Sequence, residues 1–98
     1  MSAEVYRYEF GPEIPVEDVE ASMLLSLLAA ESLHGETEVQ LAAAHFLDAD
    51  KRACVVDAGT PVGTDINKLF AGFLRREFGP AAFSVRRLAS ASAVPAAA

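Results

Sequence analysis

Residues 4–10 read EVYRYEF, and this stretch decides which face of the sheet is buried. Its side chains alternate with a period of two and are rich in aromatics, which predicts a β-strand. One face carries Tyr6, Tyr8 and Phe10, and the other carries Val5, Arg7 and Glu9. Burying the second face would place Arg7 and Glu9 in the core at a cost of several kcal/mol each. We therefore expect the aromatic face to point into the core.

Two helices are predicted, one in each half of the chain. The first covers residues 15–34, beginning at Pro15, which suits a first helical turn, and ending before Gly35. The second covers residues 64–78 and ends at Gly79. Its apolar residues recur at helical spacing, so we expect Phe70 and Phe73 to be buried against the sheet aromatics.

Three further segments are strand-like. Residues 37–47, TEVQLAAAHFL, alternate in polarity, although their three alanines support a helix equally well. Residues 52–58, RACVVDA, are rich in β-branched side chains and follow a short polar turn, which predicts a hairpin. Residues 83–88, FSVRRL, give a last strand, and the Ala/Ser-rich residues 89–98 are expected to form a disordered tail.

The predicted order is β-α-β-β-α-β within a single domain of residues 1–88. This order is typical of the α+β, ferredoxin-like arrangement, in which two helices pack on one face of a four-stranded antiparallel sheet. The first and third strands are then central, and the second and fourth are edges. Many unrelated functions use this arrangement, so the fold alone predicts no activity.

Composition excludes several classes of function. The 98 residues include 8 basic and 14 acidic side chains, a net charge of −6, which disfavours binding to nucleic acid. No apolar run approaches the roughly 18 residues that cross a membrane, and no secretory signal is visible. Cys54 is the single cysteine, so an internal disulfide is excluded and a cytoplasmic location is the simplest interpretation.

The charge is unevenly distributed along the chain. Residues 1–50 contain 11 acidic residues and 1 basic residue, whereas residues 51–98 contain 3 acidic and 7 basic residues. Either the two halves attract each other within the fold, or an acidic surface faces a basic partner.

The first helix is apolar almost all round. Its stripe for the sheet is expected to contain Val16, Val19, Met23, Leu27 and Ala30. Leu24, Leu25 and Leu28 project from other sides of the same helix and cannot all reach the sheet. Either the second helix and the turn at residues 11–15 cover these three leucines, or the leucines form an interface. We expect an interface, because contiguous exposed leucines usually mark one.

Candidate catalytic and metal-binding groups are few. His45 and Cys54 lie on the two strands of the predicted hairpin and could form a nucleophilic pair near Asp57, but free cysteine is commonly a buried small hydrophobe. Glu31 and His34 have the Glu-x-x-His spacing of di-iron sites in a single copy, which is too few ligands. We predict no metal and no cofactor.

The segment GTPVGTD, residues 59–65, precedes the second helix and is the first choice for a ligand loop. The residues concerned are Gly59, Thr60, Gly63 and Thr64. Backbone N–H groups at a helix N-terminus can bind an anion, but Asp65 would repel one. A plain turn, with Thr60 or Thr64 as the helix N-cap, is the alternative.

The sequence favours a small cytosolic protein-interaction or regulatory module. It would act as a homo-oligomer, most simply a homodimer, or as a subunit of a larger assembly, without catalytic activity of its own. The alternative is a ligand-binding enzyme of the dimeric α+β barrel type with a pocket between sheet and helices. A polar-lined cavity near His45, Tyr8 and Cys54 would favour the enzyme.

Overall fold

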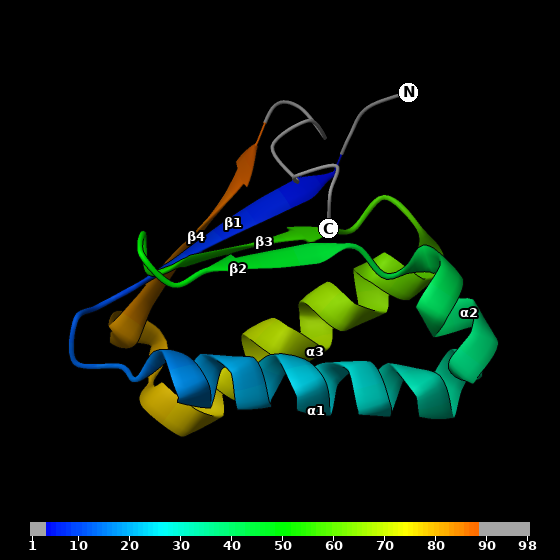
Figure 1. Cartoon of the computed structure of the whole chain (residues 1–98), viewed down its shortest axis with the longest axis horizontal. Coiled ribbons are helices and arrows are strands. Elements are labelled where there is room, and N and C mark those ends of the chain that lie inside the picture. Colours follow the sequence, from blue (N-terminus) through cyan, green and yellow to red (C-terminus); the bar gives the residue numbers. More distant parts are fainter. Residues whose placement is uncertain (1–3, 89–98) are drawn as a thin grey trace.

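An antiparallel four-stranded sheet carries helices α1 (Val16–His34) and α3 (Pro61–Phe78) on one face (Figure 1). The computed structural model describes residues 4–88, so the expected tail at 89–98 lies outside the described residues. The elements are β1 (Val5–Phe10), α1 (Val16–His34), α2 (Glu36–Ala42), β2 (His45–Asp48), β3 (Ala53–Asp57), α3 (Pro61–Phe78), a 3-10 turn (Pro80–Ala82) and β4 (Phe83–Leu88). The order in the sheet is β2-β3-β1-β4.

The α+β class is confirmed, and β1 and β3 are the central strands as expected. The strand predicted over residues 37–47 is wrong in its first half, which forms helix α2. Gly35, at φ 91°, lets the chain turn directly from α1 into α2. Glu36 and Glu38 occupy the first turn of α2, where the helix dipole favours negative charge.

The aromatic face of β1 points into the core, as predicted. Tyr8 is fully buried and meets Phe70 of α3 edge to face, with ring centroids 4.9 Å apart. The Tyr8 hydroxyl donates a hydrogen bond of 2.6 Å to Asn67 Oδ1, so its burial leaves no unsatisfied polar group. Phe70 is also fully buried, but Phe73 is only half-buried, so the prediction for Phe73 is wrong.

Helix α1 packs along α3 through short side chains that the predicted stripe did not include. Val19, Met23 and Ala30 are buried as expected, but Ser22 and Ser26 are buried as well. The Ser26 hydroxyl donates to the Ser22 carbonyl at 2.8 Å, which satisfies it inside its own helix. The expected stripe is therefore rotated towards α3, and Leu27 is left only partly buried.

Arg52, in the turn between β2 and β3, ties that turn to the connection between β1 and α1. Its Nη2 donates to the Gly11 carbonyl at 2.7 Å and also to the Ile14 carbonyl. Its backbone carbonyl accepts from Phe10 N at 3.0 Å, and its φ of 53° lies in the left-handed region. The side chain therefore holds together two loops that lie 38 or more residues apart in sequence.

Replacing Arg52 with alanine is expected to lower the free energy of unfolding by about 2 kcal/mol, because two carbonyls lose their donor. Urea denaturation followed by circular dichroism measures the loss. Lys51→Ala, at the exposed neighbouring position, serves as the matched control and is expected to change stability by less than about 0.5 kcal/mol. Equal effects of the two substitutions would contradict the clamping role of Arg52.

No helix in the described part of the chain is both long enough and apolar enough to cross a membrane.

Candidate functional site

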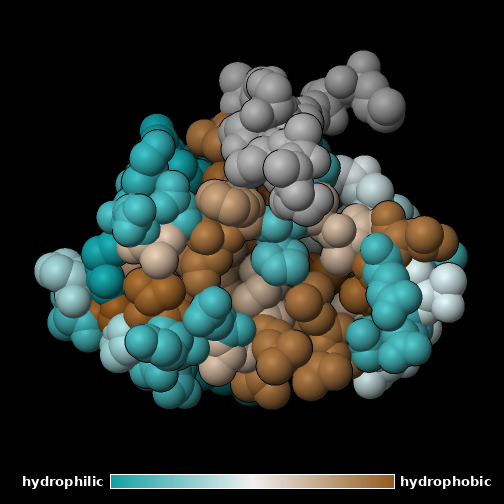
Figure 2. Space-filling model, viewed as in Figure 1, coloured by the Kyte–Doolittle hydropathy of each residue, from teal (hydrophilic) through white to brown (hydrophobic). Residues whose placement is uncertain are grey.

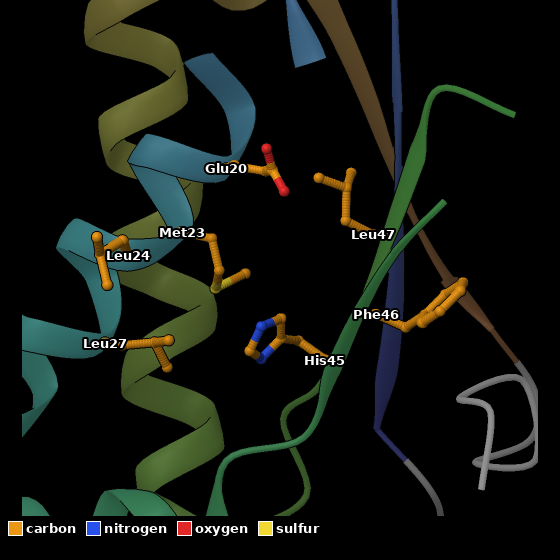
Figure 3. A pocket seen from close by; sticks show the side chains of 7 residues that line it. All are labelled: Glu20, Met23, Leu24, Leu27, His45, Phe46 and Leu47. Carbon is orange, nitrogen blue, oxygen red and sulfur yellow. The ribbon is translucent and has the colours of Figure 1, made fainter. Parts of the chain in front are cut away.

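Helix α1 and the edge strand β2 border an open groove of about 320 Å³ (Figure 3). It is lined by Glu20, Met23, Leu24, Leu27, His45, Phe46 and Leu47. His45 and Leu47 pair with Val56 and Cys54 of β3, so both project from the helix side of the sheet. Phe46 projects from the opposite face, as Figure 3 shows. The groove is thus mostly apolar, with a carboxylate and an imidazole at its walls.

The three leucines predicted as an interface are exposed at the surface of α1. Their exposed fractions are 57% for Leu24, 54% for Leu25 and 50% for Leu28. Leu24 lines the groove, whereas Leu25 and Leu28 lie beyond it on the outer side of the helix. Figure 2 shows hydrophobic side chains gathered over α1, at the lower edge of that view. We call Leu24, Leu25 and Leu28 the leucine patch.

Acidic side chains border this patch on the groove side. Glu17 and Glu31 stand seven residues before and after Leu24, and Glu20 stands four residues before it, so helical geometry puts all three on its side of α1. None of the three forms an ion pair within residues 4–88. No lysine or arginine of the described part of the chain lines the groove. The surface around the groove is therefore apolar with negative charge.

His45 and Cys54 do not form the catalytic pair that the hairpin suggested. Cys54 lies opposite Leu47, while His45 lies opposite Val56, so the register offsets the two side chains along the strands. Burial raises the pKa of the Cys54 thiol to about 12, and burial lowers the pKa of His45. Asp57 accepts a hydrogen bond from Gly59 N at 2.8 Å instead of approaching either residue. The thiol is therefore protonated and the imidazole neutral at pH 7.

The Cys54 thiol is expected to react very slowly with a thiol reagent such as 5,5′-dithiobis(2-nitrobenzoic acid) in the folded protein at pH 8. Burial keeps it protonated and inaccessible, and the thiolate is the reactive form. In urea the same thiol should react at the rate of a free cysteine. Absorbance measures both rates, and a fast reaction in the native protein would show that Cys54 is activated.

Hydrogen-bond donors of the candidate ligand loop, residues 59–65, bond to nearby groups of the chain itself. Thr60 caps α3, its hydroxyl accepting from Gly63 N at 2.9 Å, which confirms the alternative of a turn with an N-cap. The Thr64 hydroxyl donates to the Ala58 carbonyl at 2.9 Å. A side chain at Gly63 would place its Cβ 2.2 Å from the Asp57 carbonyl oxygen, so glycine allows α3 to start against the end of β3. Helix α3 consequently begins at Pro61, earlier than the predicted Thr64.

His34 pairs with Asp65 and not with Glu31. Its Nε2 lies 2.7 Å from Asp65 Oδ2, which joins the end of α1 to the first turns of α3. Within residues 4–88 no group of three or more potential metal ligands comes together.

A polar-lined cavity near His45, Tyr8 and Cys54 would favour an enzyme, but the groove does not bring these three residues together. Tyr8 and Cys54 are fully buried within the core, and the groove reaches only His45 of the three residues. The sequence interpretation missed five groove residues: Glu20, Met23, Leu27, Phe46 and Leu47. The sequence pattern placed Met23 and Leu27 in the stripe that faces the sheet. The groove forms where this stripe faces the edge strand β2, so it could be recognised only once the position of β2 was known.

Comparisons with protein-family models, with curated proteins and with solved structures give no match.

Proposed function

We propose that this chain is a small cytoplasmic protein-interaction or regulatory module that works through the outer face of α1, with no catalytic activity of its own. The observation that carries the proposal is the leucine patch, three leucines half or more exposed on successive turns of one helix. Burying a leucine side chain contributes about 1.5–3 kcal/mol, so covering the patch stabilises an assembly appreciably.

A second copy of the chain is the simplest partner. The alternative partner is a different subunit of a larger assembly. Around a two-fold axis, Leu25 of one copy would meet Leu28 of the other, because antiparallel helices pair positions about a common centre. Ala21 and Ser32 lie one turn further out on the same side, and their small side chains permit close helix approach. Asp18 and Glu17 would remain near the rim.

We further propose that the α+β domain has the ferredoxin-like arrangement. The order β2-β3-β1-β4 is the ferredoxin-like order read from its other edge, which supports that arrangement with α2 as an additional helix. In such a domain one face of each helix covers the sheet, and the outer face is available for contacts.

Nuclear magnetic resonance on mixed samples tests the proposed contact directly. One half of the chains carries ¹³C-labelled leucine methyl groups, and the other half is unlabelled. Contacts between copies are expected at the methyl groups of Leu25 and Leu28 and absent at Leu41, which is 80% exposed on α2. Contacts between copies that avoid α1 altogether would contradict the proposed surface.

A further inference from the structure

We infer that the groove between α1 and β2 binds an extended, basic segment of another protein, which adds to the free edge of β2 as a further strand. The inference rests on the proposed function, since both treat the exposed surface of α1 as a place for protein contacts. It adds the partner's chemistry and the way it binds.

The first observation is the position of β2. It is an edge strand, and among residues 4–88 it pairs only with β3, so the outward N–H and C=O groups of His45–Asp48 have no strand partner. Such an edge is a template for another extended chain. The edge carries none of the lysine or proline residues that commonly block strand addition.

The second observation is that the groove lies beside this edge on the helix side of the sheet. Its walls are α1 and β2, as Figure 3 shows. Side chains of an added strand would alternate, and those on the helix side would enter the groove between Leu27 and Leu47. Strand addition with apolar pockets for alternate side chains is a recurring way in which proteins recognise peptides.

The third observation is charge. Among residues 4–88, Glu20 is the only side chain lining the groove that is charged at neutral pH, and Glu17 and Glu31 extend the acidic border along α1. A partner segment with arginine or lysine next to its apolar residues would complement this border. A second copy would bring Asp48 at the end of its own β2, so self-pairing at this edge adds further negative charge.

A fluorescein-labelled peptide with the sequence Arg-Val-Thr-Leu-Thr-Val-Arg serves as the probe. Fluorescence anisotropy measures its affinity for the full chain, and amide shifts locate the contact. Shifts are expected at His45–Asp48 and in the methyl groups of Leu24 and Leu27. The same peptide with glutamate in place of arginine should bind at least about tenfold more weakly. A version with alternate N-methylated residues should also lose binding, because it cannot pair with a strand edge.

Two variants with the same change in net charge separate the groove from the general charge of the protein. Glu20→Lys is expected to weaken peptide binding about tenfold, whereas Glu77→Lys on the exposed end of α3 should change it by less than about twofold. Raising NaCl from about 0.05 to about 0.5 M should weaken binding, because exposed charges are screened.

The inference would be overturned if the arginine peptide did not bind at several hundred micromolar protein, or if the glutamate or N-methylated peptide bound equally well. It would also be overturned if Glu20→Lys and Glu77→Lys had equal effects on peptide binding, or if β2 paired with β2 of a second copy. If contacts between copies at Leu25 and Leu28 are observed while the peptide fails to bind, the inference alone is wrong and the proposed function stands. If the peptide binds while those contacts are absent, the two-fold contact alone is wrong.

Discussion

Replacing Phe70 with alanine is expected to lower the free energy of unfolding by about 3–5 kcal/mol. The side chain is fully buried at the centre of the core and contacts Tyr8 edge to face. Its loss leaves a cavity and removes the aromatic contact, and a domain of this size has only about 5–15 kcal/mol of stability. Urea denaturation followed by circular dichroism measures the change.

Phe73→Ala is the matched control for this substitution. Phe73 lies on the same helix but is only half-buried, so its truncation should cost less than half as much as that of Phe70. Equal costs at the two positions, or a cost below about 1 kcal/mol for Phe70→Ala, would show that α3 does not pack on the sheet in this orientation.

The double substitution Leu24→Glu and Leu28→Glu is expected to give a folded monomer. It places two charges in the leucine patch, and desolvating them in a contact is strongly unfavourable. Dimer affinity should fall at least about a hundredfold, since two buried leucines contribute about 3 kcal/mol or more. Light scattering measures the mass, and thermal unfolding shows whether the domain remains folded.

Leu41→Glu is the control for this double substitution, because Leu41 is 80% exposed on α2 and lies outside the patch. It should leave the mass of the assembly unchanged. A double variant that unfolds would show that Leu24 and Leu28 belong to the core of the domain, and one that remains a dimer would place the contact elsewhere.

Salt distinguishes the two contacts proposed on α1. Acidic residues lie at the rim of the contact between copies, so screening should strengthen self-association. The contact with a basic segment joins opposite charges, and screening should weaken it.

The orientation of the sheet was predictable from one strand. In β1, aromatic and charged side chains alternate, and only one orientation of the strand avoids burying the charged ones. Tyr8 and Phe10 are buried accordingly. Helical geometry predicted that Leu24, Leu25 and Leu28 lie off the surface that carries Met23. Their exposure needed the structure, because a covering by α3 and the turn at residues 11–15 was the alternative.

The segment from residue 36 to 42 was not predictable from its own pattern. Alanine fits a helix and a strand, and alternation over so few residues does not separate the two. What decides the helix is context: Gly35 adopts a positive φ, and Val39 is buried in the core. The offset between His45 and Cys54 has a different origin: the turn at residues 49–52 pairs Asp48 with Ala53, which places Leu47 and not His45 opposite Cys54.

The burial of Ser22 and Ser26 depended on tertiary contact with α3. A hydropathy stripe ranks serine as polar, whereas close helix packing favours a small side chain whose hydroxyl bonds to its own helix. This rotation of α1 left Leu27 partly exposed beside the edge strand. The groove therefore depends on the rotation of α1 and on the position of β2, and neither could be predicted from the sequence pattern.

The mass of the wild-type chain in solution tests most directly whether the outer face of α1 joins two copies. Light scattering at several hundred micromolar protein and about 0.5 M NaCl, where acidic repulsion is screened, should give a mass near twice 10.4 kDa. A well-folded chain that keeps the single-chain mass of 10.4 kDa under these conditions would contradict self-association through the leucine patch.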